Sequence, residues 1–247
     1  MELGPARAKL WLPARKVASP KAAERLIGKL GFVLAFPVDG VMLPSLYEAV
    51  AGPDAIAWQH GMGEAESLVW QYKDSLPAAG VAWSGKLLHR RASLLAPDLV
   101  TALYEGDGDA DDHRSFDLSE EAHRIADALA GGPLPTSALR ELVGKRSRYD
   151  RAMLELHRHL LVTSAGVREQ ASGWPVVVVE LTCRAFDVGG RADRAVATQR
   201  FLGTVLAAGP AELAKAFGWS AAGARAALDS LVDSGRARRD AGRYLAA

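Results

Sequence analysis

The chain has 247 residues, a formal net charge of +1, 49% hydrophobic residues and 24% charged residues. This length suits one large domain or two to three small ones, and the composition is ordinary for a folded protein. Because the charges nearly balance, a uniformly basic nucleic-acid-binding chain is excluded, and any such binding has to come from local basic clusters.

Several features bear on the compartment. The single cysteine, Cys183, cannot form an internal disulfide, so we expect a reducing, cytoplasmic environment. No secretory signal is visible, and the longest apolar run, around 176–179, is too short to span a membrane. The six histidines form no metal-ligand constellation, so we expect neither a metal nor another cofactor.

The first range, 1–105, is expected to be an N-terminal helical region or a decorated winged helix. The patterns predict a helix over 20–30, a strand over 32–36, a helix starting at 44–50, and helical or nearly helical stretches over 70–73, 81–88 and 97–104. Lys86, His89, Arg90 and Arg91 form a basic cluster that, with Lys73, could line a phosphate-contacting surface. The acids to consider for chemistry are Asp39, Glu48 and Asp74, although structural roles are the simpler interpretation.

Two breaks divide the rest of the chain. The stretch 105–112 is acidic and Gly-rich, which predicts a solvated linker, and Gly189-Gly190 marks a second break. They delimit a second range, 113–187, and a third, 191–247, each about the size of a winged helix.

The second range has the element order of a winged helix with a large wing. Ser119 caps a helix that runs to Ala130, a short helix spans 136–143, a longer helix spans about 147–160, and stretches 162–167 and 174–182 form a hairpin. In the longer helix, Tyr149, Met153, Leu156 and Leu160 have the spacing of a core face.

The opposite face of this helix is basic. Arg148, Arg151 and Arg158 share it, and Lys145 and Arg146 precede it near the helix N-terminus, where a phosphate could bind. In a helix-turn-helix the corresponding helix enters the DNA major groove. A solvated charged face is the alternative interpretation.

The third range repeats the order, with helices over 192–207, 211–217 and 220–234 and a hairpin over 236–245. Arg236, Arg238, Arg239 and Arg243 lie in the hairpin, where wings contact the DNA backbone, whereas Arg225 is nearly the only base-reading group of the third helix. The sequence thus predicts an α+β fold, mostly α, of tandem winged helix-turn-helix units with small β-hairpin wings.

Five segments resemble a known family, the AlkZ-related proteins. They are Leu30-Gly-Phe-Val-Leu-Ala-Phe-Pro-Val-Asp-Gly40 with the following 43–52, Trp70-Gln-Tyr-Lys-Asp-Ser-Leu-Pro77, Gly85-Lys-Leu-Leu88, and Ser147-Arg-Tyr-Asp-Arg-Ala-Met-Leu-Glu-Leu156. These proteins are short relatives of the AlkZ-type DNA glycosylases, which remove alkylated bases and unhook crosslinks with tandem winged helices. The resemblance implies DNA repair and a double-stranded DNA partner.

One departure matters for catalysis. The glycosylases carry a Gln, an apolar residue and then Gln or Asp, and the polar pair positions the attacking water. The matching stretch here is Leu34-Ala35-Phe36, whose side chains cannot orient water. We therefore expect a DNA-binding, glycosylase-like protein without the usual catalytic pair. Two alternatives stay open: an active glycosylase with relocated acids, Asp39 and Asp74 being the candidates, and a non-catalytic protein-interaction module.

Overall fold

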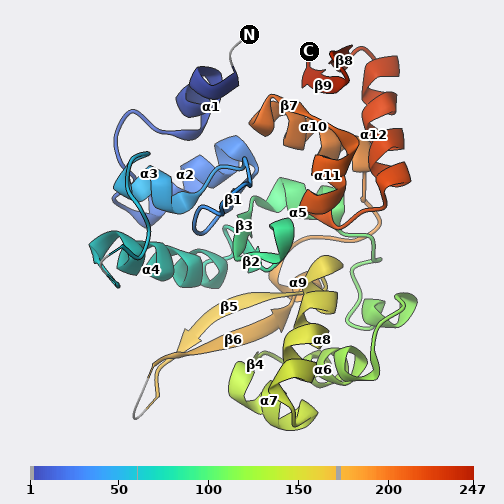
Figure 1. Ribbon diagram of the computed structural model, residues 1–247. Helices are drawn as coiled ribbons and strands as arrows, with labels where there is room; N and C mark the ends of the chain where they lie inside the picture. The colour runs from blue at the N-terminus through green and yellow to red at the C-terminus, as the bar shows by residue number, and fades with distance from the viewer. Residues whose placement is uncertain (1–2, 60, 171–173) are drawn as a thin grey trace.

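A computed structural model describes residues 3–59, 61–170 and 174–247. Over these residues the fold is mixed, about half helical, with three small antiparallel sheets (Figure 1). Three consecutive parts of the chain share one order of elements: helix, strand, helix, helix, strand, strand. In each part the first strand pairs with the last, and the last pairs with the middle one. We call these parts the first, second and third units.

The first unit follows helix α1 (Leu3–Trp11). It comprises α2 (Pro20–Leu30), β1 (Phe32–Leu34), α3 (Leu46–Ala51), α4 (Glu64–Ala78), β2 (Trp83–Gly85), the 3₁₀ turn η1 (Leu88–Arg90) and β3 (Ser93–Leu95). The stretch 81–88, for which a helical pattern was expected, instead contains β2, and that prediction was wrong. The three-residue strand exists because its backbone pairs with β3, opposite β1.

The connection to the second unit is more ordered than its composition predicts. Helix α5 (Pro97–Leu103) is followed by η2 (Asp112–Ser115). Asp112 is buried, and its carboxylate accepts hydrogen bonds from the backbone N–H groups of Asp107, Gly108 and Asp109 at 2.9, 2.9 and 3.1 Å. The Tyr104 hydroxyl donates to the same carboxylate at 2.6 Å. Most of 105–112 is solvent-exposed, as expected for a linker, but one buried acid organises the turn from inside and gives it a defined conformation.

The second and third units match their expected elements closely. The second comprises α6 (Glu120–Ala130), β4 (Leu134–Pro135), α7 (Thr136–Val143), α8 (Arg146–Arg158), β5 (Val162–Arg168) and β6 (Val176–Leu181), and α9 (Thr182–Ala185) follows it. The third comprises α10 (Arg194–Val205), β7 (Ala207–Ala208), α11 (Pro210–Phe217), α12 (Ala221–Asp233), β8 (Ala237–Asp240) and β9 (Arg243–Ala246).

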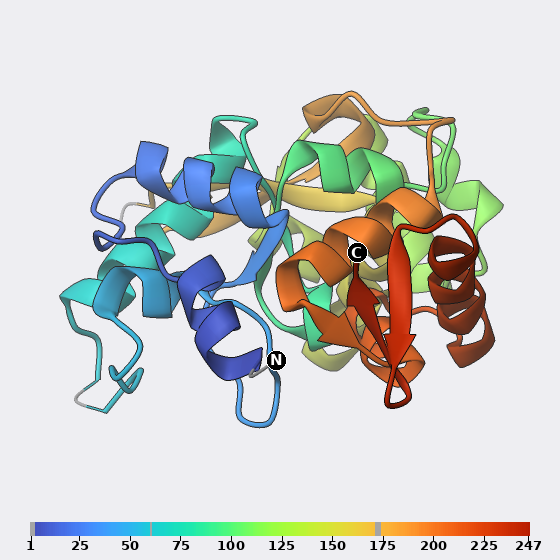
Figure 2. The same cartoon turned by 90° about the horizontal axis from the view of Figure 1, so that it is seen from above.

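The units pack around a shared hydrophobic core. One continuous cluster of buried side chains includes Phe32 and Trp83 from the first unit, Leu156 from the second, and Phe201 from the third. Polar contacts join the same elements: the Trp83 indole N–H donates to the Val162 carbonyl at 3.1 Å. The hairpin β5–β6 lies under α4, and α1 lies beside α10 when the molecule is seen from above (Figures 1 and 2). This packing sets the relative positions of side chains from all three units.

Candidate nucleic-acid interface

A groove of about 780 Å³ opens where the three units meet. The β2–β3 connection contributes one wall, α8 another, and α11 with the start of α12 the third. Its basic side chains are Lys86, Arg90, Arg151, Arg158 and Lys215, together with His89. The groove therefore collects positive charge from segments more than 120 residues apart in a chain whose net charge is only +1.

The connection between β2 and β3 adopts an unusual backbone. His89 and Arg90 have φ values of 51° and 59°, a left-handed conformation that is uncommon for residues other than glycine. Surrounding contacts hold it: the Ser93 hydroxyl accepts from the Leu88 N–H at 3.1 Å and donates to the Arg91 carbonyl at 2.7 Å. Leu87 and Leu88 are buried beneath it. Lys86 and Arg90 stay exposed on the groove side.

Helix α8 divides its arginines between two environments. Tyr149, Met153 and Leu156 are buried, as the spacing predicts. Arg151 and Arg158 line the groove, and the Arg158 guanidinium also donates to the Gly218 carbonyl of the third unit at 2.9 Å. Two other arginines lie outside the groove lining: Arg148 pairs with Glu121 at 3.2 Å, and Arg146 approaches Asp150 at 3.8 Å.

Sequence reasoning missed Lys215, which reaches the groove from α11. The helix buries Leu213, Ala216 and Phe217, so Lys215 is on the face that the core leaves exposed. That amphipathic spacing was available in the sequence, but the proximity of α11 to η1 was not. Burial lowers the pKa of His89, and the positive charge of Lys215 lowers it further.

Few acids oppose this charge. Glu155 is the one carboxylate in the groove lining among the described residues, and its Oε2 accepts from the Ser119 N–H at 2.8 Å. No salt bridge engages Lys86, Arg90, Arg151 or Lys215 in the described part of the chain. Their charge is thus available to an anionic partner.

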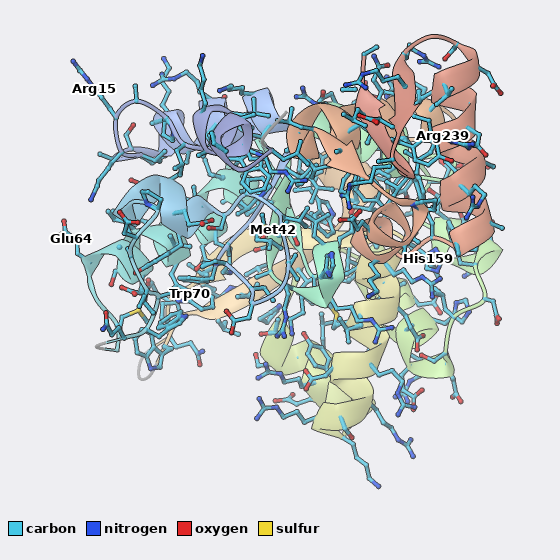
Figure 3. The ribbon with its side chains drawn as sticks, turned by 45° about the horizontal axis from the view of Figure 1, so that its top comes forward. Arg15, Met42, Glu64, Trp70, His159 and Arg239 are labelled. Carbon is cyan, nitrogen blue, oxygen red and sulfur yellow. The ribbon has the colours of Figure 1, made fainter. Side chains whose placement is uncertain are left out.

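The remaining candidates of the first unit lie outside the groove lining. The Lys73 ammonium is buried on α4, 2.5 Å from the Asp74 carboxylate and 4.9 Å from the centre of the Trp70 ring. Trp70 lies on the side of the first unit away from the third unit (Figure 3). Asp39 is exposed on the loop between β1 and α3.

The arginines of the C-terminal hairpin have partners of their own. Arg236 donates to Gln199 at 3.3 Å, and Arg238 approaches Asp240 at 3.5 Å. Arg239 pairs with Asp229 and donates to the Tyr244 hydroxyl at 2.6 Å. Arg243 pairs with Glu212 at 2.8 Å. None of these arginines belongs to the groove lining.

Comparison with known proteins places this architecture in a family. The model of the AlkZ-related family matches residues 17–217. The chain belongs to the AlkZ-related family. A second model, for the C-terminus of the ethanolamine utilization protein EutK, matches residues 206–245. Among solved structures, the chain resembles the Streptomyces sahachiroi DNA glycosylase AlkZ with a TM-score of 0.59 and 16% identity, covering 97% of this chain and 67% of that one. No curated protein matches.

In this AlkZ-related chain, the segment Leu34-Ala35-Phe36 was compared above with the catalytic polar pair of the glycosylases. The surroundings of this segment are apolar as well. Leu34 and Ala35 are fully buried. Phe36 lies among aromatic rings, with centre-to-centre distances of 4.8 Å to Trp58, 5.7 Å to Tyr47 and 6.1 Å to Trp70. The segment thus fills the first unit's core and its aromatic edge.

Two further features of this AlkZ-related protein concern metals and membranes. Among residues 3–59, 61–170 and 174–247, no three histidine, cysteine or carboxylate side chains gather as a metal site would require. Within the same residues, no helix combines the length and the apolar character needed to cross a bilayer.

Proposed function

We propose that the three units are tandem winged helices and that the protein binds double-stranded DNA in the groove between them. The shared element order and the shared strand order support this assignment, since a winged helix has three helices and a three-stranded wing sheet in that order. The structurally similar Streptomyces sahachiroi protein is a DNA glycosylase, which supports a DNA partner.

The observation that carries the proposal is the convergence of five cationic side chains, from three units, on one groove. Duplex DNA presents a dense row of phosphates that such a surface can neutralise, and each neutralised phosphate releases condensed counterions. Arg151 and Arg158 project from α8, the third helix of the second unit, which is the helix that reads or flanks the major groove in helix-turn-helix proteins. With Arg225 as nearly the only base-reading group of α12, the third unit contributes mainly to affinity.

The proposal includes the absence of glycosylase activity. A glycosidic bond is hydrolysed when a polar group orients water and stabilises the developing cation. Leu34 and Ala35 are buried hydrocarbon, and Phe36 lies among aromatic rings. Of the alternative acids, Asp74 is paired with Lys73, and Asp39 is exposed on a loop. No metal or organic cofactor is part of the proposal.

The binding test is a salt titration with labelled duplex. The triple variant Lys86→Glu, Arg90→Glu and Arg151→Glu should bind much more weakly, and its plot of log affinity against log salt should be shallower by about 2 to 3, because each lost phosphate contact removes a slope of about one. Arg15→Glu, Lys16→Glu and Lys21→Glu form the matched control, since these exposed residues carry the same charge but lie outside the groove lining. Equal losses in both triples, or no binding by the wild type at low salt, would overturn the proposal.

Catalysis is tested separately on duplex that carries N7- or N3-alkylated purines. We expect no abasic sites above the background without protein. Formation of abasic sites that is abolished by Asp74→Ala or Asp39→Ala would instead establish an active glycosylase with relocated acids.

A further inference from the structure

A second, smaller cavity of about 260 Å³ adjoins the basic groove. The two share Leu87, Arg158, Gly218 and Trp219 as walls. Beyond them the smaller cavity extends between the end of α5, the end of α8 and the start of α10, where it meets Glu105, His159 and Arg194. Figure 3 shows His159 where α8 meets the third unit. Duplex DNA in the groove would therefore run past the entrance of this cavity.

Two polar side chains of the cavity have atoms that form no hydrogen bond within the described residues. Glu105 accepts from Arg194 at 3.1 and 2.6 Å, and both bonds go to Oε1. Within the described residues, no donor reaches Glu105 Oε2, and the His159 ring makes no hydrogen bond. Burial, with a contribution from the Arg158 charge, lowers the pKa of His159, which favours the neutral imidazole, a form with one donor and one acceptor nitrogen.

The apolar part of the cavity is an aromatic wall that is held in place. The Trp219 ring lies 5.2 Å from the Phe217 ring, and the Arg194 guanidinium is stacked over it at 5.1 Å. Leu87, Leu103 and Leu160 complete the lining. A flat aromatic ring with polar edges fits this combination: rings to contact its face, and a carboxylate and an imidazole to meet its edge.

We propose that this cavity receives one nucleobase displaced from the DNA in the groove, and that Glu105 accepts a hydrogen bond from the N–H donors on its edge. This inference rests on the proposed DNA binding, since only DNA in the groove brings a base to Arg158. Guanine suits the carboxylate best, because its edge presents two adjacent N–H donors. A base that is already unpaired enters most readily, since no pairing energy has to be overcome.

The test compares two duplexes of equal length, one fully paired and one with a single bulged guanine. The wild type should bind the bulged duplex about tenfold more tightly, which is the typical contribution of one stacked base. Trp219→Ala should bring the ratio of the affinities for the bulged and the paired duplex close to one. Glu105→Ala, a change at a partly exposed side chain, should reduce the ratio for bulged guanine but not for a bulged purine without N–H donors.

The outcomes distinguish this inference from the proposed function. Wild-type binding to paired duplex with no preference for the bulge would overturn the base-binding cavity and leave the groove assignment intact. A preference that survives both Trp219→Ala and Glu105→Ala would also overturn it, because the preference would then arise from the flexibility of bulged DNA. Absence of binding to either duplex would refute the proposed function itself.

Discussion

At the scale of single residues, His157 links folding to pH. Its side chain is buried on α8 against the Trp83 ring, 5.9 Å between centres, and its Nδ1 has no hydrogen-bond partner among the residues that the structure describes. Burial, reinforced by the charge of Lys86, lowers the pKa of His157 to about 3. In the unfolded chain a histidine titrates near 6.5, so between these two values the unfolded state binds the extra proton. The free energy of unfolding is therefore unaffected by the titration of this histidine above about pH 6.5, and it decreases as the pH falls toward 3.

We therefore predict that acidification destabilises the wild type more than His157→Leu. At pH 5, about 1.5 units below the unfolded value, the difference should be roughly 2 kcal/mol. Urea denaturation at pH 7.5 and pH 5.0 measures it as the change in free energy of unfolding for each protein. If both proteins lose the same free energy, His157 is not protonated on unfolding in this range, and the explanation is wrong.

Asp112 is the residue on which the 105–112 turn depends. Asp112→Ala leaves three backbone N–H groups and the Tyr104 hydroxyl without their acceptor. Since each unsatisfied buried donor is costly, we predict a loss of about 3 kcal/mol in the free energy of unfolding. Asp109→Ala, at an exposed position in the same turn, is the control and should change stability by less than about 0.5 kcal/mol. Comparable losses in the two variants would contradict this role for Asp112.

Individual charges were the least predictable part of the candidate site. Periodicity predicts that Arg148, Arg151 and Arg158 share one face of α8, whereas the structure places only Arg151 and Arg158 in the groove lining. It could not show that Glu121, on another helix, pairs with Arg148 or that Asp74 neutralises Lys73. Such partners are set by tertiary packing, which a sequence pattern does not contain.

At the scale of elements, helices were predictable where caps and apolar spacing agree. Ser119 caps α6, Ser220 caps α12, and Gly144 follows α7, each as the sequence indicates. Strand β2 was missed because its three residues, Trp-Ser-Gly, are too few to show an alternating pattern of their own. These residues form a strand because they pair with β3, which lies between β1 and β2 in the sheet.

Gly85, the last residue of β2, tests this packing. A Cβ there would lie 2.3 Å from Trp83 Cη2 and 2.6 Å from His157 Cδ2, and neither buried ring has room to withdraw. We predict that Gly85→Ala destabilises the protein by about 1–3 kcal/mol. Gly28→Ala is the matched control, because Gly28 lies inside α2 and, apart from the backbone of its own helix, no described atom lies within 4 Å of the added Cβ.

The control should stabilise the protein by about 0.5–1 kcal/mol, since alanine is the better helix former. Thermal denaturation of both variants shows directly whether each substitution raises or lowers the stability. Two changes of the same sign would show that the interior around β2 can relax.

At the scale of the whole molecule, the repeat in the first unit was obscured by its connections. The second and third units join their helices through short connections, whereas the first unit has residues 52–63 between α3 and α4 and the left-handed turn 88–90 between β2 and β3. The groove could not be located from the sequence for a related reason: Lys86, Arg151 and Lys215 meet only when three units pack together.

That packing leads to a prediction about folding. Chains longer than about 150 residues commonly unfold domain by domain. Here, however, one buried cluster runs through all three units, and the Phe32 and Phe201 rings stack across the first and third at 5.7 Å. We therefore expect a single cooperative transition, in which the calorimetric and van't Hoff enthalpies agree.

Phe201→Ala makes this expectation specific. Phe201 is buried between Phe32 of the first unit and Phe217 of its own unit, so its truncation should reduce stability by about 3–5 kcal/mol. If the units unfold together, the whole calorimetric transition moves to lower temperature and keeps its single peak, because the lost packing destabilises all three units at once. Separate peaks, with only the lower one displaced in the variant, would show instead that the third unit unfolds independently and that the groove depends on docking between autonomous units.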